Sequence, residues 1–269
     1  MQLRSIMAFL CFGVLATPAL AQLSALEVMQ QVDARDDGNS AEGNYTLVLI
    51  DRRGRERSRN FRLYRKDYGE DSKGLSLFES PPDIRGTAYL NFDWDDTGRD
   101  DDSWLYLPAL QRVKRIASSD TSDPFMGSDF TYADINGYEL DWYDYSFVSE
   151  SVDVDGQDTW QIEFVPKPEY RERAEEATGY SRQQLWVRKD NFVPVRGQYW
   201  ETRGNRIKYY SVNELAQVEG IWTLNRIQAV TTRNGNQEHA SVLQLNGIDY
   251  NVELADELFT TERMQQGLN

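Results

Sequence analysis

Few residue types able to do chemistry occur in this chain, apart from carboxylates. His239 is the only histidine, and it lies in GNQEHAS beside the turn signal Asn234-Gly235. The only cysteine is Cys11, in an apolar stretch near the N-terminus. Ser-His-Asp or Cys-His catalysis would have to run through the one histidine, and a metal site built from several histidines is impossible. We therefore interpret His239 as an exposed hairpin residue and expect no enzyme, no cofactor and no catalytic residue.

An acidic run is the sharpest enzyme-like feature. It comprises Asp93, Asp95, Asp96, Asp100, Asp101 and Asp102. Crowded carboxylates can hold a hard cation such as Ca²⁺, and Asp93 and Asp95 are weak candidate ligands because the run begins like an EF-hand loop. Trp104 stands where that loop needs a bidentate glutamate. We favour an acidic turn between strands, with a carboxylate- or Ca²⁺-dependent envelope hydrolase as the alternative.

The N-terminus has the pattern of an export signal. Arg4 precedes the apolar run 6–16, which is too short to span a bilayer, and Ala19-Leu20-Ala21 gives a small-x-small cleavage site. Cleavage after Ala21 would leave residues 22–269 as a single domain without a thiol. We expect this product in the periplasm, free of the membrane.

The net charge of −15 limits the possible partners. Such acidity argues against nucleic acid and against stable docking on anionic lipid headgroups. It suits a carrier that touches membranes only briefly.

Hydrophobic periodicity predicts a mainly β protein with a few helices. Residues 24–36 (SALEVMQQVDARD) form a capped amphipathic helix, with Ser24 as N-cap and Glu27 three residues later. About a dozen strand-like segments follow, joined by turns such as Arg53-Gly54, Asp155-Gly156 and Asn234-Gly235. A short charged helix at 167–179 and a terminal helix at 254–266, with Leu258 and Phe259 inward, complete the pattern. This succession indicates one antiparallel meander.

An aromatic and aliphatic set alternates along these strands and could line a cavity. A half-open barrel buries one face of each strand, and that interior can hold a ligand. Filling an ordinary core is the alternative for each residue. The candidates from the strands and from the dense segment 102–135 are Phe61, Leu63, Leu90, Phe92, Trp94, Trp104, Tyr106, Phe125, Met126, Phe130, Trp160, Ile162, Phe164, Leu243 and Leu245.

Several blocks resemble the outer-membrane lipoprotein-sorting family, which has the fold of the LolA and LolB carriers. They are LFESPPDIRGTAYL, the run WLYLP at 104–108, the basic strand 112–115, FMGSDF at 125–130, and LWVRKDNFVPVRGQYWETRGNRIKYY. Together they cover roughly residues 26–258. The Leu-Pro and FMGSDF blocks are the more specific.

This resemblance implies an antiparallel half-open β-barrel of about eleven strands, wrapped around one or a few helices and enclosing an apolar cavity. It also implies a periplasmic setting and, for many relatives, partnership with an RND-type exporter. No catalytic residues are carried over from the family. Arg112, Lys114 and Arg115 are candidates for contact with lipid headgroups or a protein partner, a solvated strand face being the alternative.

We therefore expect a periplasmic carrier that binds lipid or lipoprotein acyl chains and serves outer-membrane biogenesis or an envelope export system. A burial gain of about 0.8 kcal/mol per methylene would give such a cavity affinity without specific polar contacts. A non-lipid adaptor subunit of an RND-type transporter is the remaining alternative. The cargo, the partner and the direction of transfer do not follow from the sequence.

Overall fold

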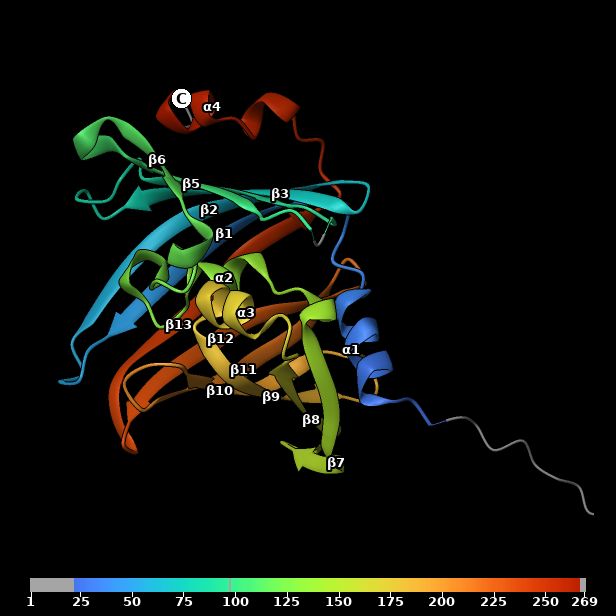
Figure 1. The fold of residues 1–269 in the computed structure, drawn as a ribbon. Helices are drawn as coiled ribbons and strands as arrows, with labels where there is room; N and C mark the ends of the chain where they lie inside the picture. Colours follow the sequence, from blue (N-terminus) through green and yellow to red (C-terminus); the bar gives the residue numbers. More distant parts are fainter. Residues whose placement is uncertain (1–21, 97, 267–269) are drawn as a thin grey trace, which may run out of the picture.

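A computed structural model describes residues 22–96 and 98–266 (Figure 1). The predicted signal segment, residues 1–21, lies outside the described residues. The strands are β1 Ser40–Ile50, β2 Glu56–Tyr68, β3 Asp71–Ser80, β4 Ala88–Asp93, β5 Asp102–Leu107, β6 Arg112–Ile116, β7 Tyr143–Val154, β8 Gln157–Pro166, β9 Tyr180–Arg188, β10 Pro194–Glu201, β11 Arg206–Val218, β12 Ile221–Arg233 and β13 Asn236–Tyr250. The α-helices are α1 Ala25–Asp33, α2 Tyr132–Asn136, α3 Arg171–Thr178 and α4 Thr261–Gln266. Single 3₁₀ turns are η1 Pro108–Leu110, η2 Ser118–Asp120, η3 Phe125–Gly127, η4 Leu140–Trp142 and η5 Asp256–Leu258.

All thirteen strands belong to one antiparallel sheet, in the order β6-β5-β4-β3-β2-β1-β13-β12-β11-β10-β9-β8-β7. The chain thus builds one half as a meander from β1 to β6 and the other from β7 to β13. The two halves meet where β1 pairs with β13. The predicted turns at 53–54, 155–156 and 234–235 join neighbouring strands. The sheet has more strands than the resemblance implies, because the short strands β4, β5 and β6 extend it beyond β3.

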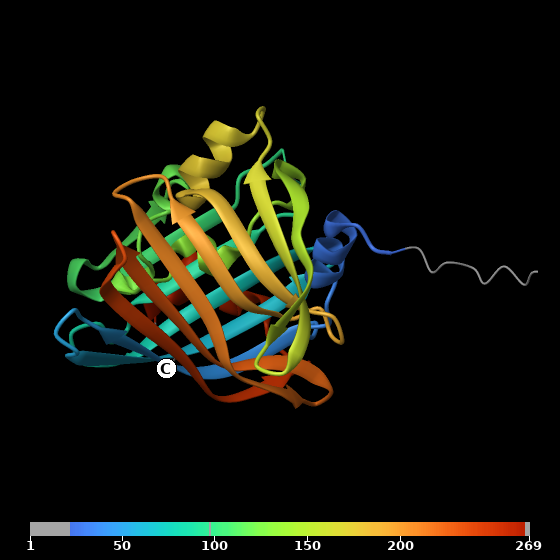
Figure 2. The same ribbon diagram turned by 90° about the horizontal axis from the view of Figure 1, so that it is seen from below.

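The sheet is strongly curved, so it forms an open trough rather than a closed barrel (Figures 1 and 2). Strands twist relative to their neighbours, and a long open sheet curls as that twist accumulates. Helix α2 lies on the concave side, whereas α4 lies on the opposite side, over the β3–β5 end (Figure 1). The mainly β antiparallel fold is therefore confirmed, in the form of an open sheet with four described α-helices.

The predicted helices are present in shortened form. Helix α1 covers 25–33, and the Ser24 hydroxyl accepts a hydrogen bond from the Glu27 backbone N–H while the Glu27 carboxylate accepts one from the Ser24 N–H. This capping box is the one predicted. Helix α3 occupies part of 167–179, and in the C-terminal segment only 261–266 is α-helical. Phe259 is buried there and Leu258 half-buried.

Strands β2 to β5 carry apolar side chains on both faces, and each face has its own cover. Phe78 and Tyr89 belong to a cluster on the concave face that includes residues of the connection between β6 and β7. Their neighbours Leu77 and Leu90 face the other way and pack with Phe259 and with Met264 of α4. Because side chains alternate along a strand, one stretch of sequence serves two separate cores.

The two outermost strands differ in length and regularity. Strand β6 has five residues, of which Arg112, Lys114 and Arg115 are exposed. Strand β7 has twelve residues, and its register with β8 shifts between Phe147 and Ser149 and again between Ser149 and Val152. Helix α1 packs against β7. Neither outer strand therefore offers a long regular edge.

Within the described part of the chain, no helix combines the length and the apolar character needed to cross a membrane.

Candidate site on the concave face

A connection between β6 and β7, residues 117–142, runs through the hollow of the curved sheet. We call it the inner segment. It contains η2, η3, α2 and η4 and is the longest connection between two strands in the described chain. Figure 1 shows α2 surrounded by the sheet. Long connections without regular structure are uncommon in compact domains and are often functional, so the candidate site is centred on this segment.

Phe125 anchors the inner segment in an aromatic cluster. Its ring centroid lies 6.5 Å from that of Phe61, 6.0 Å from Phe78 and 5.6 Å from Tyr89, which come from β2, β3 and β4. A further contact, at 5.5 Å, is to Tyr132 of α2. Phe125 is 2% exposed. Aromatic pairs at these separations add to the stabilisation from burial, so this ring holds the inner segment against the apolar centre of the trough.

The FMGSDF block forms the turn that presents Phe125. Met126 and Gly127 both have positive φ angles, 49° and 72°, which reverse the chain. The hydroxyl of Ser128 donates to the carbonyl oxygen of Phe125 at 2.7 Å and accepts from the Phe130 N–H at 3.1 Å. Arg59 of β2 donates to the Met126 carbonyl oxygen. The block is therefore a compact turn tied to the sheet.

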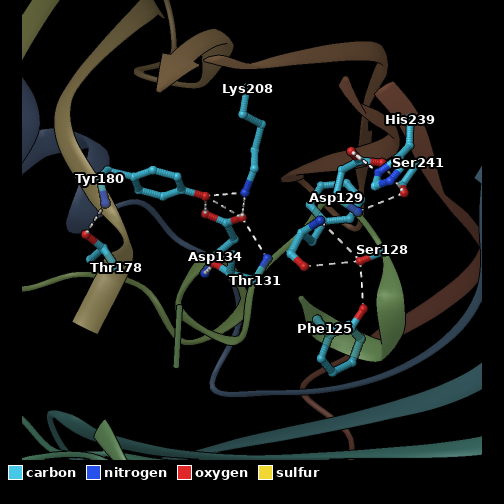
Figure 3. Close-up of polar contacts among 11 residues, drawn as sticks. Phe125, Ser128, Asp129, Thr131, Asp134, Thr178, Tyr180, Lys208, His239 and Ser241 are labelled. Atoms are coloured by element: carbon cyan, nitrogen blue, oxygen red, sulfur yellow. Dashed lines mark hydrogen bonds and ion pairs between the residues drawn. The ribbon is translucent and has the colours of Figure 1, made fainter. Parts of the chain in front are cut away.

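A buried ion pair fixes α2 to the opposite wall of the trough (Figure 3). Lys208 of β11 lies 2.8 Å from the Asp134 carboxylate, and its side chain is 4% exposed. The Tyr180 hydroxyl of β9 donates to the same carboxylate at 2.9 Å and also contacts the lysine ammonium. Asp134 completes a capping box with Thr131 at the start of α2. Burial and the adjacent carboxylate raise the pKa of Tyr180 well above its usual value.

A second polar contact joins the inner segment to β13. The Ser241 hydroxyl accepts from the Asp129 N–H at 2.9 Å and donates to Asp129 Oδ2 at 2.7 Å. The Asp129 side chain is 1% exposed, and its Oδ1 has no hydrogen-bond partner among the described residues; His239 Nδ1 is 3.5 Å away. His239 itself is exposed at the start of β13, as the sequence predicts. Lys208–Asp134 and Asp129–Ser241 together form what we call the latch.

Two cavities of about 870 Å³ each lie along the inner segment, and both are lined largely by polar and charged side chains. The first contains Asp93, Asp101 and Glu139. Burial and neighbouring carboxylates raise their pKa values to about 7, about 6 and about 7. The second contains Lys208 and Asp129. The inner segment occupies the apolar part of the concave face, and these two cavities lie beside it.

The structure distributes the predicted cavity residues over separate clusters. The first cluster adjoins the inner segment, the second lies beside α1 and α3, and the third lies under α4 on the other face of the sheet. Their members are Phe61, Leu63, Phe125, Met126, Phe130 and Leu243 in the first, Trp160, Ile162 and Phe164 in the second, and Leu90, Phe92, Trp104 and Tyr106 in the third.

Two predicted residues remain outside these clusters. Leu245 is buried beside Tyr45, and Trp94 lines the first cavity and packs on Phe92. The four residues under α4 cannot share a ligand with the concave face, because the sheet separates the two sides. A lipid contact for the remaining candidates stays a prediction.

The charged candidates also have defined places. Arg112 and Lys114 are exposed near the tip of the β5–β6 hairpin, and Arg115 pairs with Asp102 at 2.5 Å. The acidic run joins β4 to β5: Asp93 ends β4, Asp102 begins β5, and the other four aspartates lie in the connection between these strands. Residues 22–96 and 98–266 contain no group of three or more side chains placed to hold a metal ion, so Asp93 and Asp95 gain no support as ligands.

Three residues of the latch, Asp134, Lys208 and Ser241, and the neighbouring Tyr180 were not predicted from the sequence. They come from α2, β9, β11 and β13, and Lys208 is 74 positions from its partner. No local pattern joins such residues. A lysine within the alternating apolar strand IKYYSV at 207–212 is the one signal that could have indicated a buried cation.

Both the sequence and the fold match known proteins. Residues 70–266 match the model of a protein family described as "Uncharacterized protein". A DUF1329 family protein from Desulfovibrio piger is 29% identical, with a TM-score of 0.79 over 89% of this chain and 97% of that one. A domain from Vibrio parahaemolyticus, assigned as an outer membrane lipoprotein-sorting protein, is 27% identical, with a TM-score of 0.78 over 90% and 98%.

A LolA superfamily protein from Nitrosomonas europaea shares the fold, with 18% identity and a TM-score of 0.66 over 90% of this chain and 99% of that one. Among curated proteins no significant match was found.

Proposed function

Because the chain belongs to the family that matches residues 70–266 and has the LolA-like fold of outer-membrane lipoprotein-sorting proteins, we propose that it is a carrier of lipid or lipoprotein acyl chains. The cargo would bind on the concave face of the sheet, where the inner segment now lies. We place this activity in the periplasm, between two membranes, in the service of an envelope export system such as an RND-type transporter. No catalytic step is needed.

One observation carries the proposal: the apolar concave face of β2 to β4 is covered by one connection between strands, the inner segment, and not by a second sheet. Phe125 occupies a hollow formed by Phe61, Phe78 and Tyr89. An acyl chain entering this hollow would replace one apolar occupant with another. Displacement of the inner segment therefore costs the protein less than exposure of the same face to water.

The polar latch suits a segment that must leave and return. A buried ion pair contributes little net stability, because the desolvation of both charges offsets their attraction. It does define one docked position, since any other position leaves Lys208 or Asp134 buried without a partner. Each acyl methylene that enters would contribute about 0.8 kcal/mol, so a chain of ordinary length can offset the loss of the docked segment.

A reversible cross-link tests whether the segment must move. Asp129 and Ser241 have side chains in hydrogen-bond contact, and the described chain contains no cysteine, so a D129C/S241C variant can form one defined disulfide. We expect the oxidised variant to lose binding of a fluorescent fatty-acyl probe, dansyl-undecanoic acid, and the reduced variant to regain it.

The S241C single variant under the same oxidant serves as the matched control. Equal binding by the oxidised and reduced double variant would show that the probe does not enter beneath the inner segment. Absence of probe binding by the unmodified protein, together with failure of phospholipid vesicles to donate lipid to it, would contradict the carrier function itself.

A further inference from the structure

Exposed arginines gather at one end of the strands, except at the β8–β9 connection of that end, where α3 carries Glu172, Glu175 and Glu176. The turns β1–β2, β3–β4, β5–β6, β10–β11 and β12–β13 lie on one rim of the sheet, because consecutive strands are antiparallel and β1 pairs with β13. In Figures 1 and 2 these turns lie on the left, opposite α1. Each of the five contains or adjoins an arginine. We call this edge the basic rim.

The arginines of the basic rim are directed to solvent. Arg52, Arg53, Arg57, Arg85, Arg112 and Arg203 are all exposed. Arg52 is 74% exposed in its side chain and shares Glu238 with Arg206 and Arg233. Among the described residues, Arg53, Arg85 and Arg112 form no ion pair. Unpaired cations held on neighbouring rigid turns make a positive surface that the net charge of −15 conceals.

The opposite ends of β2 to β5 have the reverse character. The connection between β2 and β3 contains Glu70, and the acidic run extends from Asp93 at the end of β4, through the connection, to Asp102 at the start of β5. These carboxylates surround the first cavity. The strands β1 to β6 therefore present cations at one end and carboxylates at the other, and an anionic surface would attract the first end and repel the second.

The basic rim also carries the most exposed large apolar side chain of the described residues. Leu110, at the tip of the β5–β6 hairpin in η1, is 67% exposed. Gln111 follows with φ 48°, which turns the chain back so that Leu110 projects. Arg112 comes next, and Pro108 packs beside the β3–β4 loop that contains Arg85. An apolar tip among arginines matches the interface of a bilayer, with acyl chains below and phosphates at the level of the cations.

We propose that the basic rim is a docking surface for the anionic surface of a phospholipid bilayer, with Leu110 entering the headgroup region. The second cavity lies at this rim and is lined by Arg203 and His239, and also by carboxylates of α3 and of the inner segment. Docking in this orientation presents that end of the concave face to the membrane and turns the acidic end away. Docking to a membrane is a separate property from the binding of acyl chains, and each can be tested without the other.

Vesicle flotation with the full protein tests the docking. We expect binding to vesicles of phosphatidylethanolamine and phosphatidylglycerol (3:1), no binding to pure phosphatidylcholine, and loss of binding at high salt. The R53E/R112E variant should bind at least about tenfold more weakly, since each cation near an anionic surface contributes to affinity. The control K189E/R196E makes the same change in net charge at residues remote from the basic rim and should bind as the unmodified protein does.

A fluorescent reporter tests the position of the tip. In an L110W variant, titration with the same anionic vesicles should shift the added emission to shorter wavelength, and brominated lipids should quench it. The L110D variant should lose binding without a change in melting temperature. Absence of vesicle binding, or equal losses in R53E/R112E and K189E/R196E, would overturn the proposal. Either result would leave probe binding in solution, and hence the carrier proposal, unaffected.

Discussion

The two covers of strands β2 to β5 differ in how they are fastened. On the outer face, η5 and α4 bury Phe259 and Met264 against Leu77 and Leu90, and their polar contacts, such as that of Tyr68 with Asp256, lie at the periphery. On the concave face, the inner segment buries Phe125 but is also held by polar groups within the protein. An apolar cover contributes directly to stability, whereas a buried polar fastening fixes a position at little net gain. On the proposed function, the outer cover is permanent and the inner one is removable.

Removal of one phenyl ring from each cover gives the largest expected effect. Phe259→Ala should lower the free energy of unfolding by about 4 kcal/mol, because Phe259 is 2% exposed in a closed apolar cluster. Phe125→Ala should instead release the inner segment and increase the affinity for the fatty-acyl probe. Urea unfolding and probe titration of both variants measure this. A higher probe affinity in Phe259→Ala than in Phe125→Ala would reverse the assignment of the two covers.

Removal of the Lys208–Asp134 ion pair should have the next largest effect on the free energy of unfolding. Lys208→Met leaves Asp134 buried without its cation, and we expect a loss of about 3 kcal/mol in the free energy of unfolding. Hydrogen exchange should rise in residues 129–136 before it rises elsewhere. The double variant K208M/D134N should recover part of the loss, although Asp134 also caps α2. A loss that is uniform over the chain would argue against an inner segment that detaches separately.

Removal of one hydroxyl group from each of the two covers compares them by a smaller change in stability. Ser241→Ala deprives the buried Asp129 of two contacts and should cost about 2 kcal/mol. Tyr68→Phe removes the contact with Asp256 at the solvent-exposed edge of the outer cover and should cost less than about 0.5 kcal/mol. Thermal or urea unfolding of the two variants in parallel measures both losses. Similar losses would mean that both covers are fastened alike.

A further effect concerns the pH dependence of stability and the acidic end of the strands. The pKa of Asp93 is raised to about 7 in the folded protein, so its ionised form disfavours folding. Stability should therefore fall as the pH rises from about 4 through 7. Asp93→Asn should raise the free energy of unfolding by about 1 kcal/mol at pH 8 and leave it unchanged at pH 4. Melting curves at the two pH values test this, and an equal stabilisation at both would mean that the charge of Asp93 is not its cause.

Local signals in the sequence predict the strands, the turns and the capping box at Ser24, and the resemblance to LolA-like proteins is confirmed. These local signals do not show which side chains of a strand point to the concave side of the curved sheet. In Ala88-Tyr89-Leu90 all three side chains are fully buried. The alternating pattern therefore predicts Leu90 and Phe92 as cavity residues as readily as Tyr89, although Leu90 and Phe92 lie under α4 on the other face of the sheet. The latch was beyond prediction because its partners meet only when the inner segment crosses the trough.

The ends of the sheet bear on how this protein behaves at high concentration. An open sheet leaves unpaired backbone groups on its first and last strands, and such groups can recruit a second chain and begin aggregation. Strand β6 is short and carries cations at three of its five positions, so two copies repel along it. Strand β7 is longer, but its shifts in register disturb the straight ladder that a second strand would need. Both outer strands of this open sheet therefore disfavour pairing with the edge of a second chain.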